Sequence, residues 1–205
     1  VIYKGRAYIG VGGSGNFAPY SGHNISVIDL KSNTIAYSIE TRGYPQASSL
    51  LTTAYEKDDQ SVYVYFFENL TPGKMRVIKD KPGQTAPSEV QIETDNRQNQ
   101  YTVAPTLFTP SGAHAQYVIC SPIADEYGNI YFKNDSSHMF MIGPTIKELR
   151  ITQKPKKTEY TVGETFDPTG LKVEAVYSTG KTRDITKYIG YNTNPLSLDD
   201  EDFEI

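Results

Sequence analysis

Short runs of alternating apolar and polar residues recur along the first 145 positions, and turn-forming Gly, Pro, Asn and Asp residues separate them. Alternation with a period of two is the pattern of half-buried β-strands. Three segments share one order, in which a strand and a polar turn lead into an aromatic-rich strand and then into a further apolar strand. They span residues 1–30, 48–78 and 121–142. We therefore expect three similar antiparallel sheets.

One such segment buries only one face, so that by itself it would be marginally stable. Stacking successive segments around a shared axis supplies the missing partner surface, as in the blades of a β-propeller. The second segment is followed by a long polar insertion at roughly residues 81–116, which Pro and Gly interrupt repeatedly. We expect this insertion to contain a fourth, outer strand at residues 89–92. The alternative is a ligand-contacting loop, because long loops often carry function.

The pattern changes after Gly143-Pro144. Residues 145–151 alternate as a strand, residues 171–177 form a second one, and residues 182–186 a third. In the middle strand the side chains expected on the core face are Leu171, Val173, Ala175 and Tyr177. Short strands at this spacing, with turn signals between them, are typical of a β-sandwich. The predicted fold class is therefore all-β, with partial β-propeller blades over residues 1–144 and a sandwich over residues 145–205.

A motif within the second domain resembles the bacterial immunoglobulin-like domains of Gram-positive surface proteins. It reads Tyr-x-x-Gly-Glu followed by Phe-Asp-Pro-Thr-Gly-Leu-x-Val-x-Ala-x-Tyr-x-x-Gly, here from Tyr160 to Gly180. The resemblance implies an extracellular or cell-surface location, and it implies that these residues build the fold and perform no chemistry. Because the family continues into a closing strand, we also expect this chain to be a piece of a larger polypeptide.

The first domain resembles the last blades of a quinoprotein-like propeller, on the segments 43–49, 121–125 and 128–135. Propellers of that kind dock their blades with a repeated Trp, and this chain has none. We therefore expect neither the quinone cofactor of that family nor any other cofactor. Three blades do not close a propeller. Either other sequence completes it, or copies of the chain associate as a homo-oligomer.

Composition narrows the possible partners. The chain has 20 basic and 24 acidic residues and a formal net charge of −4, which argues against a nucleic-acid surface. Its one cysteine, Cys120, excludes an internal disulfide. No run of 18 apolar residues is present, so no membrane insertion is expected.

Candidate chemistry is sparse. Gly10-Val11-Gly12-Gly13-Ser14-Gly15 fits a dinucleotide-binding spacing, but residues 16–22 cannot form the helix that would hold the pyrophosphate. We interpret it as a turn between strands. The three histidines are too widely spaced to indicate a metal site. No catalytic residue is predicted. Asp29, Asp125 and Asp135 are the carboxylates that a propeller-type glycoside hydrolase could use, but no spacing selects a pair.

Tyrosine offers the clearest binding chemistry, because its ring stacks on sugars while its hydroxyl forms hydrogen bonds. Tyr20, Tyr44 and Tyr117 are predicted in connecting loops, and Gln46 could add an amide. The sequence therefore predicts a non-enzymatic binding or spacer region of a cell-surface protein that contacts a polysaccharide, a host protein or a cell-wall protein. The alternative is an accessory region, or a partial site, of a propeller-type glycoside hydrolase.

Overall fold

The computed structural model describes residues 1–13, 22–93 and 99–197. The chain is all-β and divides into two compact units, Val1–Gly143 and Pro144–Ile205. Among the described residues the only helical segments are single 3-10 turns, η1 at Gly112–His114 and η2 at Thr186–Tyr188. No helix in this part of the chain is long and apolar enough to cross a membrane.

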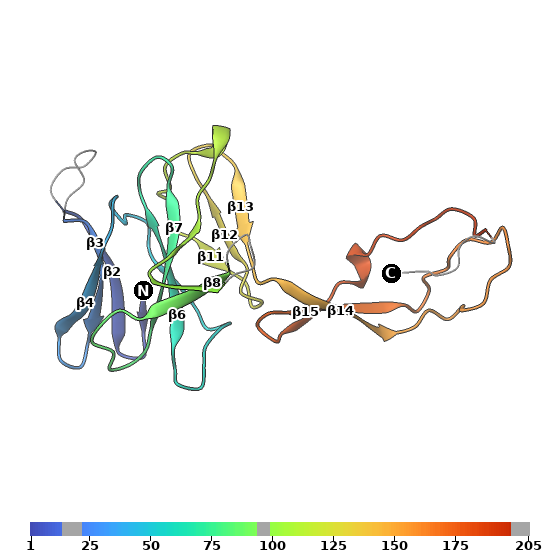
Figure 1. The fold of residues 1–205 in the computed structure, drawn as a ribbon, viewed down its shortest axis with the longest axis horizontal. Helices are drawn as coiled ribbons and strands as arrows, with labels where there is room; N and C mark the ends of the chain where they lie inside the picture. The colour runs from blue at the N-terminus through green and yellow to red at the C-terminus, as the bar shows by residue number, and fades with distance from the viewer. Residues whose placement is uncertain (14–21, 94–98, 198–205) are drawn as a thin grey trace. The chain divides into compact units, whose positions relative to one another are not determined.

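Three antiparallel sheets make up most of the first unit (Figure 1). The first contains β1 (Ile2–Tyr3), β2 (Arg6–Val11), β3 (Asn24–Asp29) and β4 (Thr34–Glu40), hydrogen-bonded in chain order. The third contains β11 (Ile123–Ala124), β12 (Ile130–Lys133) and β13 (Met139–Ile142). The strands expected in these two regions are confirmed, whereas β4 was not predicted.

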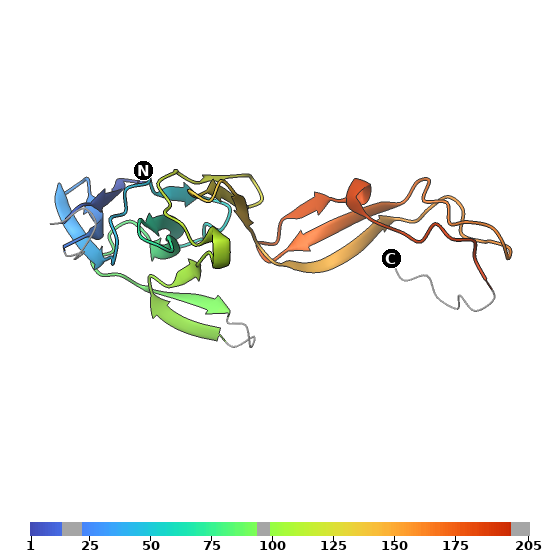
Figure 2. The same ribbon diagram turned by 90° about the horizontal axis from the view of Figure 1, so that it is seen from above.

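The second sheet runs in the order β10-β7-β6-β5, with β5 at Leu50–Thr52, β6 at Val62–Glu68, β7 at Lys74–Asp80 and β10 at Thr106–Phe108. The expectation that residues 89–92 supply its fourth strand is wrong. Residues Glu89–Glu93 form β8, which pairs with β9 (Asn99–Val103) as a separate two-stranded sheet. Figure 2 shows this hairpin projecting to one side of the three sheets. Its two strands are neighbours in sequence and pair locally, which leaves the edge of β7 for β10.

The second sheet is buried on both faces because the side chains of β6 alternate between two hydrophobic clusters. Val64 and Phe66 pack with residues of the first sheet, among them Ile25 and Val27. Tyr65 and Phe67 face the other way and join Ile130 and Phe132 of the third sheet. The rings of Phe67 and Phe132 lie 4.8 Å apart. The aromatic-rich strand predicted at residues 62–66 is thus the central layer of the unit.

A buried polar cluster joins the first two sheets. The Asp80 carboxylate accepts hydrogen bonds from Arg6 Nε and Nη2, each at 3.0 Å. It also accepts the hydroxyl hydrogens of Tyr8 at 2.8 Å and Tyr37 at 2.7 Å. Burial raises the pKa of both tyrosines, and the Asp80 charge adds to the effect. Both hydroxyls therefore stay protonated and donate to the carboxylate.

The second unit contains one three-stranded sheet among its described residues, in the order β14 (Ile146–Gln153), β15 (Lys172–Tyr177) and β16 (Thr182–Asp184). The predicted core face is confirmed, because Val173, Ala175 and Tyr177 are buried together with Leu171. These residues repeat at every second position, so that they share one face of the sheet.

The motif residues of this unit hold turns and corners together. Gly163 and Gly170 have positive φ angles of 91° and 90°, which a side chain would strain. Asp167 Oδ1 accepts the amide hydrogen of Thr169 at 2.9 Å, and the amide of Asp167 donates to the Tyr160 hydroxyl at 3.0 Å. These contacts fix the turns of this unit.

Candidate functional site

Two of the four predicted binding residues lie together at one end of the first unit. Tyr44 forms an isolated β-bridge with Asn69, and Asn69 Nδ2 donates to Gln46 Oε1 at 3.0 Å. The Tyr44 ring also stacks on the buried ring of His23, with 5.7 Å between their centroids. Tyr44 is therefore held against the fold, and its hydroxyphenyl group is only half-buried.

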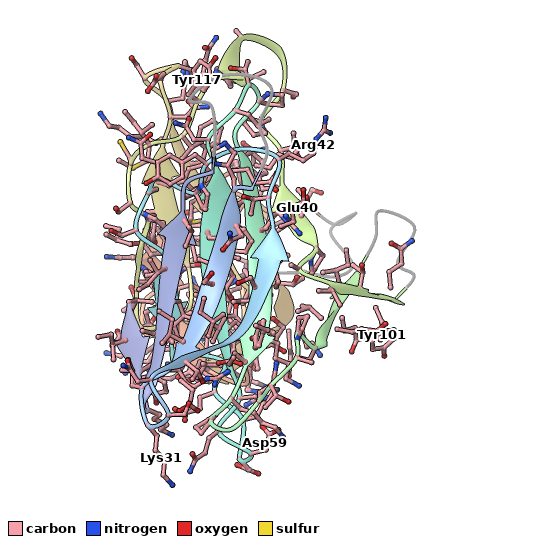
Figure 3. All side chains as sticks on the ribbon, turned by 90° about the vertical axis from the view of Figure 1, so that its left-hand side faces the viewer. Lys31, Glu40, Arg42, Asp59, Tyr101 and Tyr117 are labelled. Atoms are coloured by element: carbon pink, nitrogen blue, oxygen red, sulfur yellow. The ribbon has the colours of Figure 1, made fainter. Side chains whose placement is uncertain are left out.

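Tyr117 lies at the same end. The backbone carbonyl of its neighbour Gln116 accepts the amide hydrogen of Gly73, in the β6–β7 turn that also contains Asn69. The Tyr117 side chain is 37% exposed. Figure 3 shows Tyr117 and Arg42 toward the same end of the unit, with Lys31 and Asp59 at the opposite end. We call segments 42–46, 69–73 and 114–118 the turn end. Tyr20, the fourth predicted residue, lies outside the described residues.

The structure explains why glycines stand at positions 10 and 12 of the glycine motif. A Cβ on Gly10 would collide with the backbone carbonyl of Pro45, and a Cβ on Gly12 would touch the Tyr44 ring at 3.4 Å. Gly10 therefore lets segment 42–46 approach β2 directly. Gly13 donates its amide hydrogen to Nδ1 of His23 at 2.8 Å. These contacts fit a turn between strands, while Ser14 and Gly15 of the motif fall outside the described residues.

The histidines do not assemble a metal centre. The rings of His114 and His138 meet with 3.9 Å between their centroids, and His138 Nδ1 lies 2.9 Å from the carbonyl oxygen of Ser136. Across the described part of the chain, no group of three or more His, Cys, Asp or Glu side chains is arranged to hold a metal ion.

Two of the three candidate carboxylates, Asp29 and Asp125, accept hydrogen bonds within their own turns. Asp125 Oδ1 accepts the amide hydrogens of Tyr127 and Asn129, and its Oδ2 accepts Asn129 Nδ2 at 2.7 Å. Burial opposes the charge of Asp125, but these hydrogen bonds outweigh it and lower its pKa. Asp29 has a lowered pKa chiefly because the amide of Ser32 donates to it. A lowered pKa is unfavourable for a general acid at neutral pH.

A cavity of about 230 Å³ beside the second sheet gathers aromatic and polar side chains, and we call it the tyrosine cavity. Its lining consists of three tyrosines, two other polar residues and three aliphatic residues: Tyr55, Tyr63, Tyr65, Lys57, Gln91, Val77, Val90 and Leu107. β6 supplies two of the tyrosines, the β5–β6 turn supplies the third, and β7, β8 and β10 complete the wall.

The three rings of this cavity are fixed by the fold. Tyr55 packs edge-on to Tyr63, with centroids 6.2 Å apart and an interplanar angle of 81°. A Cβ on Gly128 would lie 2.7 Å from Cε2 of Tyr55, so that glycine is what allows the ring to lie against the β11–β12 turn. Tyr63 and Tyr65 are two positions apart on β6 and therefore point to the same face of the sheet.

The hydroxyls of this cavity remain protonated. Burial raises the pKa of Tyr55 to about 12, and the nearby Asp125 charge adds to the effect. Burial also raises the pKa of Tyr63 and of Tyr65. Within the described residues none of these hydroxyls forms a hydrogen bond with another protein group, so each is available both to donate and to accept.

Sequence reasoning missed this cavity. The tyrosines predicted to bind come from connecting loops, whereas Tyr63 and Tyr65 lie within a strand. Their shared face was visible in the alternation, but its covering by β8 and β10 was not. Tyr65 does pack in the core, with 7% of its surface exposed, yet it also borders the cavity.

Part of the second unit is similar to a known protein family. Residues 153–192 match the family model of the bacterial Ig-like domain (group 3). This match supports the immunoglobulin-like resemblance of the second unit, and it is consistent with a binding or spacer region of a surface protein. No curated protein matches the chain.

Proposed function

We propose that this chain is a non-enzymatic binding region of a Gram-positive cell-surface protein, in which the immunoglobulin-like unit is a spacer and the first unit binds a polysaccharide. The observation that carries this proposal is the tyrosine cavity. A pyranose ring has apolar C–H faces and a rim of hydroxyls, and the cavity offers aromatic faces together with hydroxyl, amide and ammonium groups. Its volume of about 230 Å³ suits one sugar unit more than a large ligand.

The turn end extends this proposal to the residues predicted from sequence. Tyr44, Gln46 and Tyr117 would contact further units of a polymer, since Tyr44 is half-buried and the other two side chains are exposed. A contact with a host or cell-wall protein at this end is the other form of the proposal, and a binding assay with glycans alone separates the two.

The occupied carboxylates support the absence of catalysis. Asp29 and Asp125 already accept several hydrogen bonds inside their own turns, which suits structural roles. The alternative, a partial glycoside hydrolase site, predicts turnover of a bound glycan. Turnover that is lost on substituting Asp125 or Asp135 would overturn the non-enzymatic proposal.

An array of neutral and acidic oligosaccharides tests the binding proposal. Calorimetry then measures the affinity of the neutral oligosaccharide that binds most tightly. Tyr55→Ala should weaken that binding about tenfold, because it removes a ring and a hydroxyl from the cavity. The matched control is Tyr101→Ala on β9, whose side chain is 59% exposed and does not line the cavity. Equal binding by the two variants would contradict the proposed site.

We also propose that the three sheets are blades of a β-propeller. The outer face of the first sheet exposes Ile2 and Ile35, at 68% and 63% of their surfaces, in one cross-strand row. The outer face of the third sheet exposes Ile123 and Met141, at 67% and 61%. Such faces suit packing against further sheets. Analytical sedimentation of the chain tests what covers these two faces. A dimer that Met141→Glu dissociates supports covering by a second copy, and a monomer supports covering by a neighbouring segment of a longer polypeptide.

A further inference from the structure

A second cavity, of about 470 Å³, lies beside the adjoining ends of β6 and β7 and has a basic lining. Arg42, Lys74 and Arg76 contribute to it together with the buried carboxylate of Glu68 and residues 102–106. We call it the basic cavity. Three cations face one carboxylate there, although the chain as a whole carries a net charge of −4. The local charge is therefore opposite to the overall charge.

The single carboxylate of the basic cavity is already neutralised. Glu68 Oε1 accepts Arg76 Nη1 at 2.7 Å and the amide hydrogen of Arg42 at 3.2 Å. Arg76 is further fixed by Nε, which donates to the carbonyl of Ala104, and by Nη1, which donates to the carbonyl of Glu40. Its Nη2 donates to none of the described residues. These bonds hold the guanidinium of Arg76 rigidly and leave its Nη2 to donate to a ligand.

The other two cations have no partner within the residues that the structure describes. Lys74 lies directly opposite Glu68 in the β6–β7 ladder, yet its ammonium forms no ion pair with it. Arg42 is exposed and forms no side-chain ion pair in this part of the chain. Because Lys74 and Arg76 are two positions apart on β7, they point to the same face of the sheet. Thr102 and Thr106 add exposed hydroxyls to the lining.

We propose that the basic cavity binds an oxyanion, namely a carboxylate or phosphate group. The Arg42 and Lys74 side chains offer positively charged donors, Arg76 Nη2 offers another donor, and the two threonines offer hydroxyls. Charge-assisted hydrogen bonds from guanidinium and ammonium groups to an oxyanion are about twice as strong as neutral ones. The backbone is also unusual here, since Ala104 has a positive φ of 46° while its carbonyl holds Arg76. Strain of this kind concentrates at ligand sites.

This site is separate from the tyrosine cavity and does not rest on it. Arg42, Lys74 and Arg76 line only the basic cavity, and Tyr55, Tyr63 and Tyr65 line only the tyrosine cavity. Loss of oxyanion binding in Tyr55→Ala would therefore contradict the assignment. Two natural sources share the chemistry, the carboxylate of an acidic sugar and the phosphate of a phosphorylated polymer.

The test is a titration of the whole chain with inorganic phosphate, with glucuronate and with glucose. The amide chemical shifts of the protein are measured at each ligand concentration. Phosphate or glucuronate should shift amides of residues 42, 74 and 102–106, whereas glucose should not. A response to phosphate alone assigns a phosphorylated ligand, a response to glucuronate alone assigns an acidic sugar, and a response to both supports the shared oxyanion chemistry. No response to either probe would overturn the proposal.

Charge-matched variants make the test specific. Arg42→Gln and Lys74→Gln should each weaken binding about tenfold, since each removes a hydrogen bond to a charged group. Lys31→Gln changes the net charge equally at the opposite end of the unit (Figure 3) and should leave binding unchanged. Arg42 is exposed, so its replacement should not disturb folding. Equal weakening by Lys31→Gln would show a non-specific charge effect and overturn the site.

Discussion

The Arg6 guanidinium and the Asp80 carboxylate form a two-point ion pair in which both side chains are almost completely buried. Their residues are 74 positions apart in sequence, and the pair connects β2 of the first sheet with β7 of the second. Burying two charges is costly, so that the pair is stable only while each partner compensates the other. The tyrosine hydroxyls on Asp80 complete that compensation.

Removing one member of this pair should strongly destabilise the first unit. Asp80→Asn keeps the side-chain shape but leaves the charge of Arg6 buried without its main partner. We expect a loss of about 3–5 kcal/mol in the free energy of unfolding. Urea unfolding followed by the amide signals of β6 measures this loss. In the control Asp59→Asn the lost partner is Lys81, both side chains are about half exposed, and the midpoint should stay unchanged.

Gly10→Ala should destabilise the turn end, because the added Cβ collides with the carbonyl of Pro45. Overpacking of this kind costs about 1–3 kcal/mol. The neighbouring change Gly12→Ala makes only an ordinary contact with the Tyr44 ring and should be nearly neutral. Thermal unfolding of the two variants gives the comparison. A Gly10→Ala variant as stable as Gly12→Ala would show that segment 42–46 does not need this close approach.

Tyr55 should ionise late in an alkaline titration. Its pKa is about 12 in the folded chain, against an ordinary value of 10.0. Between these values the folded state keeps a proton that the unfolded state has lost. The stabilisation from Tyr55 is therefore fully present below pH 10 and is lost as the pH rises through about 12. The Cζ chemical shift of labelled tyrosine follows the ionisation, and Tyr55→Phe identifies its signal. A midpoint near pH 10 would contradict the buried position of this hydroxyl.

Val173→Ala should destabilise the second unit, because Val173 is only 2% exposed on the core face of β15. Lost burial and the resulting cavity together cost about 2 kcal/mol. The control Val162→Ala removes the same atoms from a side chain that is 64% exposed, and it should change little. Hydrogen exchange of the β15 amides reports on this unit alone. Equal protection in the two variants would mean that the predicted core face contributes little to stability.

The sequence by itself determined the local features of this protein. Alternation at positions 62–66 and 171–177 predicted strands, and it predicted which side chains of β15 are buried, because a strand places every second residue on one face. The motif from Tyr160 to Gly180 predicted the immunoglobulin-like region through its family resemblance, and its glycines and Asp167 fix local turns. Tyr44 and Gln46 are also close in sequence, and they do lie together.

Only the tertiary structure decided which of these faces form sites. The tyrosine cavity needs Tyr63 from β6 to meet Gln91 from the insertion, and the basic cavity needs Arg42 to meet Lys74. These pairs come from separate elements, and no local pattern states which elements become neighbours. Residues 89–92 show the same limit. Their alternation predicted a strand correctly, but its pairing with β9 and not with β7 depended on competition between distant edges.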